Sequence, residues 1–263
     1  MRPNRVRGLM KKDSFGGLPK KLCLLLLLAP ILSVLTCSEL CAYEGQLRKT
    51  VDSVLEAYGG REQVAKVMTI AAHGRIDDFL RNVSGGYART MVRPGSLRID
   101  IMPERGGEVR ILSNGRGLQG NGQRLEEANP LSLSSMQYQY GYLDLPMSLA
   151  DNSAKASHKG IKELHGRPME VLYVELSGAP GLFVYIDLET HLIRRVEAKF
   201  DMNGMGSSLL GTEYDDFRLV DGVLFPFRLV NFAGDSNISI ISIVRLTINQ
   251  PLPRNALPTL GET

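Results

Sequence analysis

The sequence predicts a mainly β protein folded as one large, curved antiparallel sheet or barrel. From Met68 onwards, apolar and polar residues alternate along short runs, as is typical of strands with one buried face. Clusters of Gly, Asn, Asp and Pro separate the runs, so the connections are short enough for antiparallel pairing. No strand–helix–strand repeat is present, which argues against a parallel sheet. We count about eleven strands and expect them in a single domain.

Turn residues separate the expected strands. Asp221-Gly222 lies between two alternating runs, which is the strongest short signal for a two-residue hairpin. Asn114-Gly115 marks another turn, and the glycines that follow up to Gly122 are expected to be turn residues too. The expected strands are Met68–Leu80, Gly86–Arg93, Ser96–Ile101, Glu108–Leu112, Ile161–Leu164, Met169–Leu176, Leu182–Leu188, Leu192–Phe200, Tyr214–Val220, Val223–Phe232 and Ile238–Ile248.

An amphipathic helix is expected before the first strand, from Gln46 to Tyr58. Its apolar residues recur with the spacing of one helical stripe, and Gly59-Gly60 supplies the left-handed residue that ends it. A second, short helix is expected from Arg61 to Val67. The stripe consists of Leu47, Val51, Val54, Leu55 and Tyr58.

One face of the sheet is predicted to be apolar and buried, and the other to be exposed to solvent. Along one strand, Leu192, Val196, Ala198 and Phe200 fall on one side, and Arg195, Glu197 and Lys199 fall on the other. The inner face is expected to include Leu97, Ile99 and Ile101 from an early strand and Ile238, Ile240, Val244, Leu246 and Ile248 from the last. An apolar face of this size needs another element to cover it.

The segment from Pro130 to Asp151 is the one long interruption between the strands. Four of its apolar residues have helical spacing, whereas Gly141 and Pro146 are expected to break the helix. Two interpretations stay open: a buried connecting helix, or a movable lid of Met, Tyr and Leu side chains over the apolar face. The four residues are Met136, Tyr140, Leu143 and Met147.

The first 42 residues are expected to be a secretory signal, cleaved after Ala42, and residues 43–263 to be the mature domain. The leader has a basic start followed by an apolar core that is too short to span a bilayer. Translation could begin at Met1 or Met10, and the alternative to cleavage is a lipoprotein anchored through Cys37. All cysteines, Cys23, Cys37 and Cys41, lie in the leader, so the exported chain has no disulfide.

Charge and motifs exclude several classes of function. The chain has 31 Lys and Arg against 28 Asp and Glu, and the basic excess is concentrated in the leader, so no nucleic-acid partner is expected. The four histidines, His73, His158, His165 and His191, have no metal-binding spacing. Asp77-Asp78 and Asp215-Asp216 would point to opposite faces of a strand. We therefore expect no enzyme, metal or cofactor.

Several ordered stretches resemble a known family. They are MVRPGSLRIDI followed by VRILSNGRGL, then DLETHLIRRVEAKF and YDDFRLVDGVLFPF, within a similarity that runs from about Gln46 to Asn249. The chain resembles the LolA/LolB-like periplasmic lipoprotein carriers and outer-membrane lipoprotein-sorting proteins. That resemblance implies an incomplete, half-open antiparallel barrel whose hydrophobic cavity is closed by a helical lid.

The resemblance also implies a function and a gate. The implied protein is a periplasmic monomer that binds the acyl chains of a lipoprotein or lipid and delivers them towards the outer membrane, between an inner-membrane transporter and an outer-membrane receptor. The alternative is an envelope sensor or an accessory module of a membrane lipid transporter. Arg93, before Pro94, matches the arginine that hydrogen-bonds the backbone of the lid helices. The expected ligand-binding or gating residues are Arg93, Met136, Tyr140, Leu143, Met147, Leu97, Ile99, Ile240 and Val244.

Overall fold

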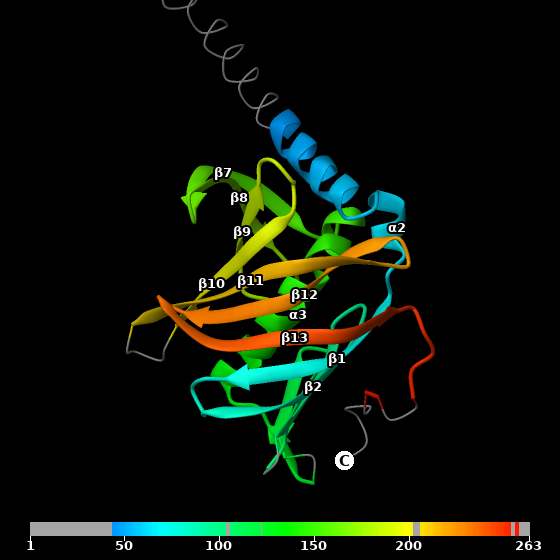
Figure 1. The fold of residues 1–263 in the computed structure, drawn as a ribbon, viewed down its shortest axis with the longest axis vertical. Helices are drawn as coiled ribbons and strands as arrows, with labels where there is room; N and C mark the ends of the chain where they lie inside the picture. The colour runs from blue at the N-terminus through cyan, green and yellow to red at the C-terminus, as the bar shows by residue number, and fades with distance from the viewer. Residues whose placement is uncertain (1–43, 104–105, 122, 202–205, 254–255, 258–263) are drawn as a thin grey trace, which may run out of the picture. The chain divides into compact units, whose positions relative to one another are not determined.

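One antiparallel sheet of thirteen strands runs through the part of the chain that the computed structural model describes, residues 44–103, 106–121, 123–201, 206–253 and 256–257 (Figure 1). The leader, its three cysteines and the cleavage site after Ala42 lie outside the described residues. In chain order the strands are β1 (Thr69–Asp78), β2 (Val83–Val92), β3 (Ser96–Pro103), β4 (Glu108–Ser113), β5 (Arg116–Gly120), β6 (Leu125–Glu127), β7 (Lys155–Leu164), β8 (Arg167–Glu175), β9 (Leu182–Asp187), β10 (Ile193–Asp201), β11 (Ser207–Val220), β12 (Val223–Ala233) and β13 (Ser236–Ile248).

The order of the strands in space explains why the sheet stays open. The strand order in the sheet is β6-β5-β4-β3-β2-β1-β13-β12-β11-β10-β9-β8-β7. Strands β1 to β6 pair in chain order, as do β7 to β13, and β13 pairs with β1 to join the two sets. β6 and β7 are the two edges and do not pair with each other in the described residues. The predicted half-open antiparallel barrel is confirmed.

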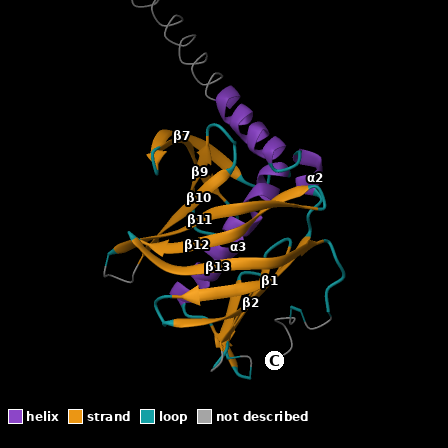
Figure 2. Cartoon of the chain, viewed as in Figure 1, coloured by secondary structure: helices purple, strands orange, loops and turns teal. Residues whose placement is uncertain are grey.

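Helix α3 (Pro130–Ala150) joins the two edges and is enclosed by the strands (Figure 2). The predicted break is wrong, because the helix continues through Gly141 and Pro146. Asn129 caps its start by accepting a hydrogen bond from the Ser132 amide at 2.9 Å. A side chain at Gly141 would press on Ala179, so glycine gives the β8–β9 loop room to approach. Burial along the helix therefore outweighs the weak helix propensity of these two residues.

Two strands, β5 and β6, were missed. β5 contains Gly117 and Gly120, which the sequence suggested were turn residues, and β6 is only three residues long. A side chain at Gly117 would press on Ala128 and on Leu133 and Met136 of α3, so glycine lets β5 pack closely against the helix. The turns that bound the other strands were predicted correctly. At Asp221 and Gly222 both φ angles are positive, 47° and 85°, as a two-residue hairpin requires.

The inner face of β13 differs from the prediction. Val244 was expected there but is 77% exposed, and Ile240 is only half-buried, whereas Ile241 and Ile243 are in the core. A bulge is the reason: His73 of β1 pairs with Arg245, and the next residue of β1 pairs with Ile243. Val244 is left over, and the alternation shifts by one residue. The predictions for Leu246 and Ile248, which follow the bulge, are confirmed.

The opposite face is not uniformly wet. Glu197 of β10 is only 6% exposed, and its carboxylate accepts a hydrogen bond from the Tyr185 hydroxyl at 3.0 Å. The Arg195 guanidinium pairs with the same carboxylate at 2.5 Å and lies over the ring of Phe232. A second small apolar cluster, Met169, Val171 and Tyr185, lies beside it. The side chains of β8 to β10 thus bury polar groups on the face that was expected to be solvated.

The two short helices before β1 were predicted correctly. The first is helical over residues 44–57, and α2 (Arg61–Ala65) follows. Thr50 donates a hydrogen bond to the buried Glu170 carboxylate of β8 at 2.7 Å, and the Tyr58 carbonyl accepts one from the Leu224 amide of β12 at 2.9 Å. These contacts attach the first helix to strands far from it in sequence.

Candidate functional site

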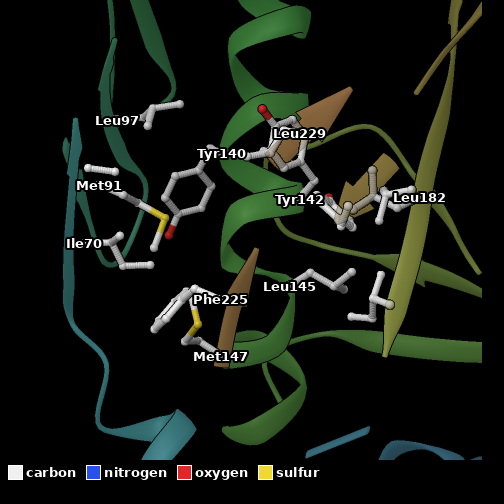
Figure 3. Close-up of a cluster of buried hydrophobic side chains, with 14 of the residues drawn as sticks. Ile70, Met91, Leu97, Tyr140, Tyr142, Leu145, Met147, Leu182, Phe225 and Leu229 are labelled. Carbon is white, nitrogen blue, oxygen red and sulfur yellow. The ribbon is translucent and has the colours of Figure 1, made fainter. Parts of the chain in front are cut away.

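The candidate site is the contact between α3 and the inner face of the sheet. Figure 3 shows Tyr140 and Met147 of α3 on the side of Met91 and Ile70, while Leu182 packs on the opposite side of the helix. One continuous core cluster includes both halves of the sheet and the helix. An apolar inner face covered by one helix is therefore the principal feature of the molecule.

Most residues expected to line the site are where the sequence placed them. On α3, the side chains of Met136, Tyr140 and Met147 are buried, and Leu143 is half-buried against the same core. Leu97 and Ile99 lie on the inner face of β3. Ile240 and Val244 do not belong to this set, because of the bulge in β13. The structure therefore brings together the lid residues and the β3 residues.

Arg93 points inwards and pairs with α3. Its Nε donates to the Asp144 carboxylate, and its Nη2 donates to Asp151 Oδ2 at 2.7 Å. Only 8% of the Arg93 side chain and 7% of the Asp144 side chain are exposed, so the pair is buried. The resemblance implied hydrogen bonds to the lid backbone, whereas here Arg93 holds two carboxylates of the helix.

The pKa values around Arg93 reflect burial and pairing. Burial raises the pKa of Asp144, and the hydrogen bond from Ser148 and the charge of Arg93 offset this only in part. Burial would lower the pKa of Arg93, but Asp144 and Asp151 outweigh it and the pKa rises. Partial burial of Asp151 is outweighed by hydrogen bonds from Ser153 and Arg93, which hold its pKa below the usual value. Asp144 is therefore the first of the two carboxylates to lose its charge as the pH falls.

Arg61 binds the backbone at the end of α3. Its Nη1 donates to the carbonyl oxygens of Leu149 and Ala150 at 3.1 and 2.8 Å, and its Nη2 pairs with Asp52 at 2.8 Å. The last carbonyls of a helix have no partner within it, so a guanidinium here acts as a cap. No sequence signal pointed to Arg61, because the segment it caps is distant in the chain. Two arginines, Arg61 and Arg93, thus fasten the C-terminal end of α3.

Replacing Arg61 with glutamine is expected to loosen this end of the helix. The cap would be lost, which should lower the free energy of unfolding by roughly 1 kcal/mol and speed amide exchange in the last turn of α3. Hydrogen–deuterium exchange and chemical denaturation measure the two effects. Lys66→Gln is the matched control, since Lys66 lies in an exposed pair with Glu62 of α2. Equal effects of the two changes would argue against a capping role.

The space between α3 and the sheet is nearly filled. A cavity of about 30 Å³ remains, lined by residues that include Tyr58, Arg89, Tyr142 and Tyr214. Binding pockets for lipid-sized or drug-sized molecules are usually about 300–1,000 Å³. This cavity is therefore too small for a ligand of that size, which would fit there only if α3 moved away from the sheet.

Among the described residues, no helix has both the length and the apolar character needed to cross a bilayer. No group of three or more His, Cys, Asp or Glu side chains in the same part of the chain is arranged to hold a metal ion.

Solved structures share this fold. No family model matches the chain, and no curated protein matches it. A DUF1329 family protein from Desulfovibrio piger superposes with a TM-score of 0.52 at 10% identity, over 81% of this chain and 97% of that one. A LolA superfamily protein from Nitrosomonas europaea gives 0.49 at 11% identity, over 78% and 96%. An outer membrane lipoprotein-sorting protein domain from Vibrio parahaemolyticus gives 0.49 at 10%, over 74% and 92%.

The chain shares the fold of the DUF1329 family protein from Desulfovibrio piger. At this level of identity the likeness concerns the fold alone. Within this fold the covering element is α3, and the two arginines that fasten it lie in the β2–β3 turn and in α2.

Proposed function

We propose that the protein binds the acyl chains of a lipoprotein or lipid between α3 and the inner face of the sheet. The observation that supports this proposal is the single helix, rich in Met, Tyr and Leu, that covers an apolar face and is fastened at one end by Arg61 and Arg93. Burying an acyl chain yields roughly 0.8 kcal/mol per methylene, on the order of 10 kcal/mol for a long chain. That is enough to keep a lipid in a protein without a covalent bond.

Opening is proposed to begin at the C-terminal end of α3. Arg93 acts as the gate, since breaking its buried pair with Asp144 frees the helix to move. The opened space would then be lined by Met136, Tyr140, Leu143 and Met147 on the lid and by Leu97 and Ile99 on β3. Met side chains adapt to ligands of different shape, which suits acyl chains.

The expected leader and the fold support a proposal for the cellular role. We propose that the chain is exported to the periplasm and carries its cargo towards the outer membrane, receiving it from an inner-membrane transporter and passing it to a receptor. The name of the Vibrio parahaemolyticus domain, an outer membrane lipoprotein-sorting domain, is in keeping with this role. Native mass spectrometry of protein purified from its own envelope tests it, since the proposed carrier should retain acylated molecules.

A disulfide that locks α3 provides a sharper test. A side-chain carbon at Gly141 would lie 3.2 Å from the Cβ of Ala179, close to the separation of about 3.5–4.5 Å in a disulfide. In the exported protein, Gly141→Cys combined with Ala179→Cys should therefore tie the middle of α3 to the β8–β9 loop. We expect the oxidised variant to refuse a fluorescent fatty-acid probe and the reduced variant to bind it.

The reduced form of the same variant and the unmodified protein, each with and without reductant, are the controls. Uptake of the probe by the oxidised form to the same extent as by the reduced form would contradict binding beneath α3. No uptake by the unmodified protein would contradict acyl binding altogether.

A further inference from the structure

Arg89 of β2 is a buried cation that has no carboxylate partner among the described residues. It is 3% exposed, its Nε and Nη1 atoms make no hydrogen bond, and it belongs to no ion pair among the residues that the structure describes. Arginine is almost never fully buried unless it is paired, because desolvating an isolated guanidinium is costly. Arg93, four residues later, is also buried, but its charge is balanced by the carboxylates of Asp144 and Asp151. A buried arginine without such partners points to a group that arrives from outside.

The guanidinium lies inside the candidate site. Arg89 pairs in register with Ala72 of β1 and Ile99 of β3, both buried on the inner face. It also lines the cavity of about 30 Å³ beneath α3, together with Tyr142 and Tyr214. A space of this size holds about one water molecule or a single polar group.

Other unsatisfied donors surround Arg89. The hydroxyls of Tyr87 and Tyr214 are buried without a hydrogen-bond partner. Burial raises the pKa of both tyrosines and of Tyr142, and the positive charge of Arg89 opposes this in all three, so the guanidinium lies near each ring. Arg89 lies beside the Tyr87 hydroxyl but forms no hydrogen bond of normal geometry with it. Arg89 and Tyr214 thus line the same cavity, and Tyr87 is buried beside Arg89 on the same face of β2.

The local charge is positive. The positive charge of Arg110 on β4 also opposes the rise in the pKa of Tyr87 and Tyr142. Its guanidinium pairs with the Glu108 carboxylate at 2.5 Å. Glu108 binds Arg81 as well, so one carboxylate serves two arginines and does not neutralise Arg89. A positively charged, donor-rich space with low exposure is complementary to an anion.

We propose that Arg89, with the Tyr87 and Tyr214 hydroxyls, binds the anionic group of a lipid whose acyl chain lies beneath α3. This inference rests on the proposed function, since it names the chemical class of the ligand: an amphiphile that carries a carboxylate or a phosphate, and not an uncharged lipid. The acyl chain contacts the apolar inner face, and the head group supplies the counter-charge that the chain itself lacks at Arg89.

Three probes with the same alkyl chain test the proposal: hexadecanoate, hexadecyl phosphate and the neutral hexadecanol. Their binding to the exported protein is measured by displacement of a fluorescent acyl probe. We expect at least one anionic probe to bind about tenfold or more tighter than hexadecanol, as charge-assisted hydrogen bonds would allow. Comparison of the two anions tells whether a carboxylate or a phosphate is preferred.

Variants assign the preference to Arg89. Arg89→Met keeps a long apolar stem and removes the charge, so the two anionic probes should bind this variant no tighter than hexadecanol does. Arg89→Lys should retain part of the preference. Arg98→Met, on the outward side of β3, is the matched control and should keep all of it.

Thermal unfolding provides a second measurement. Because Arg89→Met removes an unpaired buried charge, its melting temperature should equal or exceed that of the unmodified protein. A large fall would mean that Arg89 is satisfied by buried water as a structural residue, and would overturn the proposal. Binding of all three probes with equal affinity would also overturn it while leaving acyl binding intact, whereas failure to bind any probe would contradict the proposed function itself.

Discussion

Replacing Arg93 with leucine is expected to release the C-terminal end of α3. Asp144 would be left as a buried carboxylate without a counter-ion, and breaking one side of such a pair typically costs 3–5 kcal/mol. We expect the free energy of unfolding to fall by roughly that amount. Backbone amides near Asp144 and Asp151 should also exchange faster in the folded protein, and the variant should bind cargo but fail to hand it on.

Two further variants separate the gate from a general loss of stability. Arg98→Leu removes an arginine from a partly exposed pair with Asp100 in the same hairpin and is expected to change stability by less than about 1 kcal/mol. Adding Asp144→Leu to Arg93→Leu removes the orphaned charge and should restore much of the stability, but not the cargo transfer. Normal transfer by Arg93→Leu would show that the pair is structural only.

Replacing Gly59 with alanine is expected to disturb the junction between the first helix and the β11–β12 hairpin. Gly59 has a φ of 115°, and a side chain there would overlap the carbonyl of Gly222 in the hairpin turn. Backbone strain of this kind costs about 1–3 kcal/mol, and the overlap adds to it, so we expect a loss of more than about 3 kcal/mol in the free energy of unfolding.

Gly60→Ala is the matched control for that experiment. Gly60 also has a positive φ, 93°, but a side chain there would meet no atom within 4 Å. The variant should therefore show the cost of strain without the overlap. Chemical denaturation of both variants measures the difference, and equal losses would argue against close packing of the helix end on the hairpin.

Strands with alternating apolar and polar residues, and turns that require particular residue types, could be predicted from the sequence. The hairpin at Asp221-Gly222 and the helix end at Gly59 depend on residues adjacent in sequence, so the sequence alone is enough to predict them. The glycines of β5 and the continuous α3 depend on contacts between distant segments. Gly117 and Gly141 leave room for neighbours that lie elsewhere in the chain, and their low propensity was misleading.

The candidate site was predicted only in part for the same reason. Arg93 could be singled out because it precedes a proline at a strand end, but its partners Asp144 and Asp151 are more than fifty residues away. Val244 was misplaced because the bulge that exposes it is set by pairing with β1. Arg61 and Arg89 lacked any local signal, since a cap for a distant helix and a missing counter-ion are visible only in three dimensions.

The position of α3 between the two sheet edges limits how it can move. The helix is connected to β6 through Ala128 and Asn129, and to β7 through residues 151–154, so it stays attached to both edges of the sheet even when its C-terminal end is released. A displacement of α3 would therefore bend the helix outwards or move the two edge strands apart. Binding of a ligand inside the barrel would therefore shift β6 and β7. Another protein that paired with the free edges of these strands could detect whether a ligand is bound.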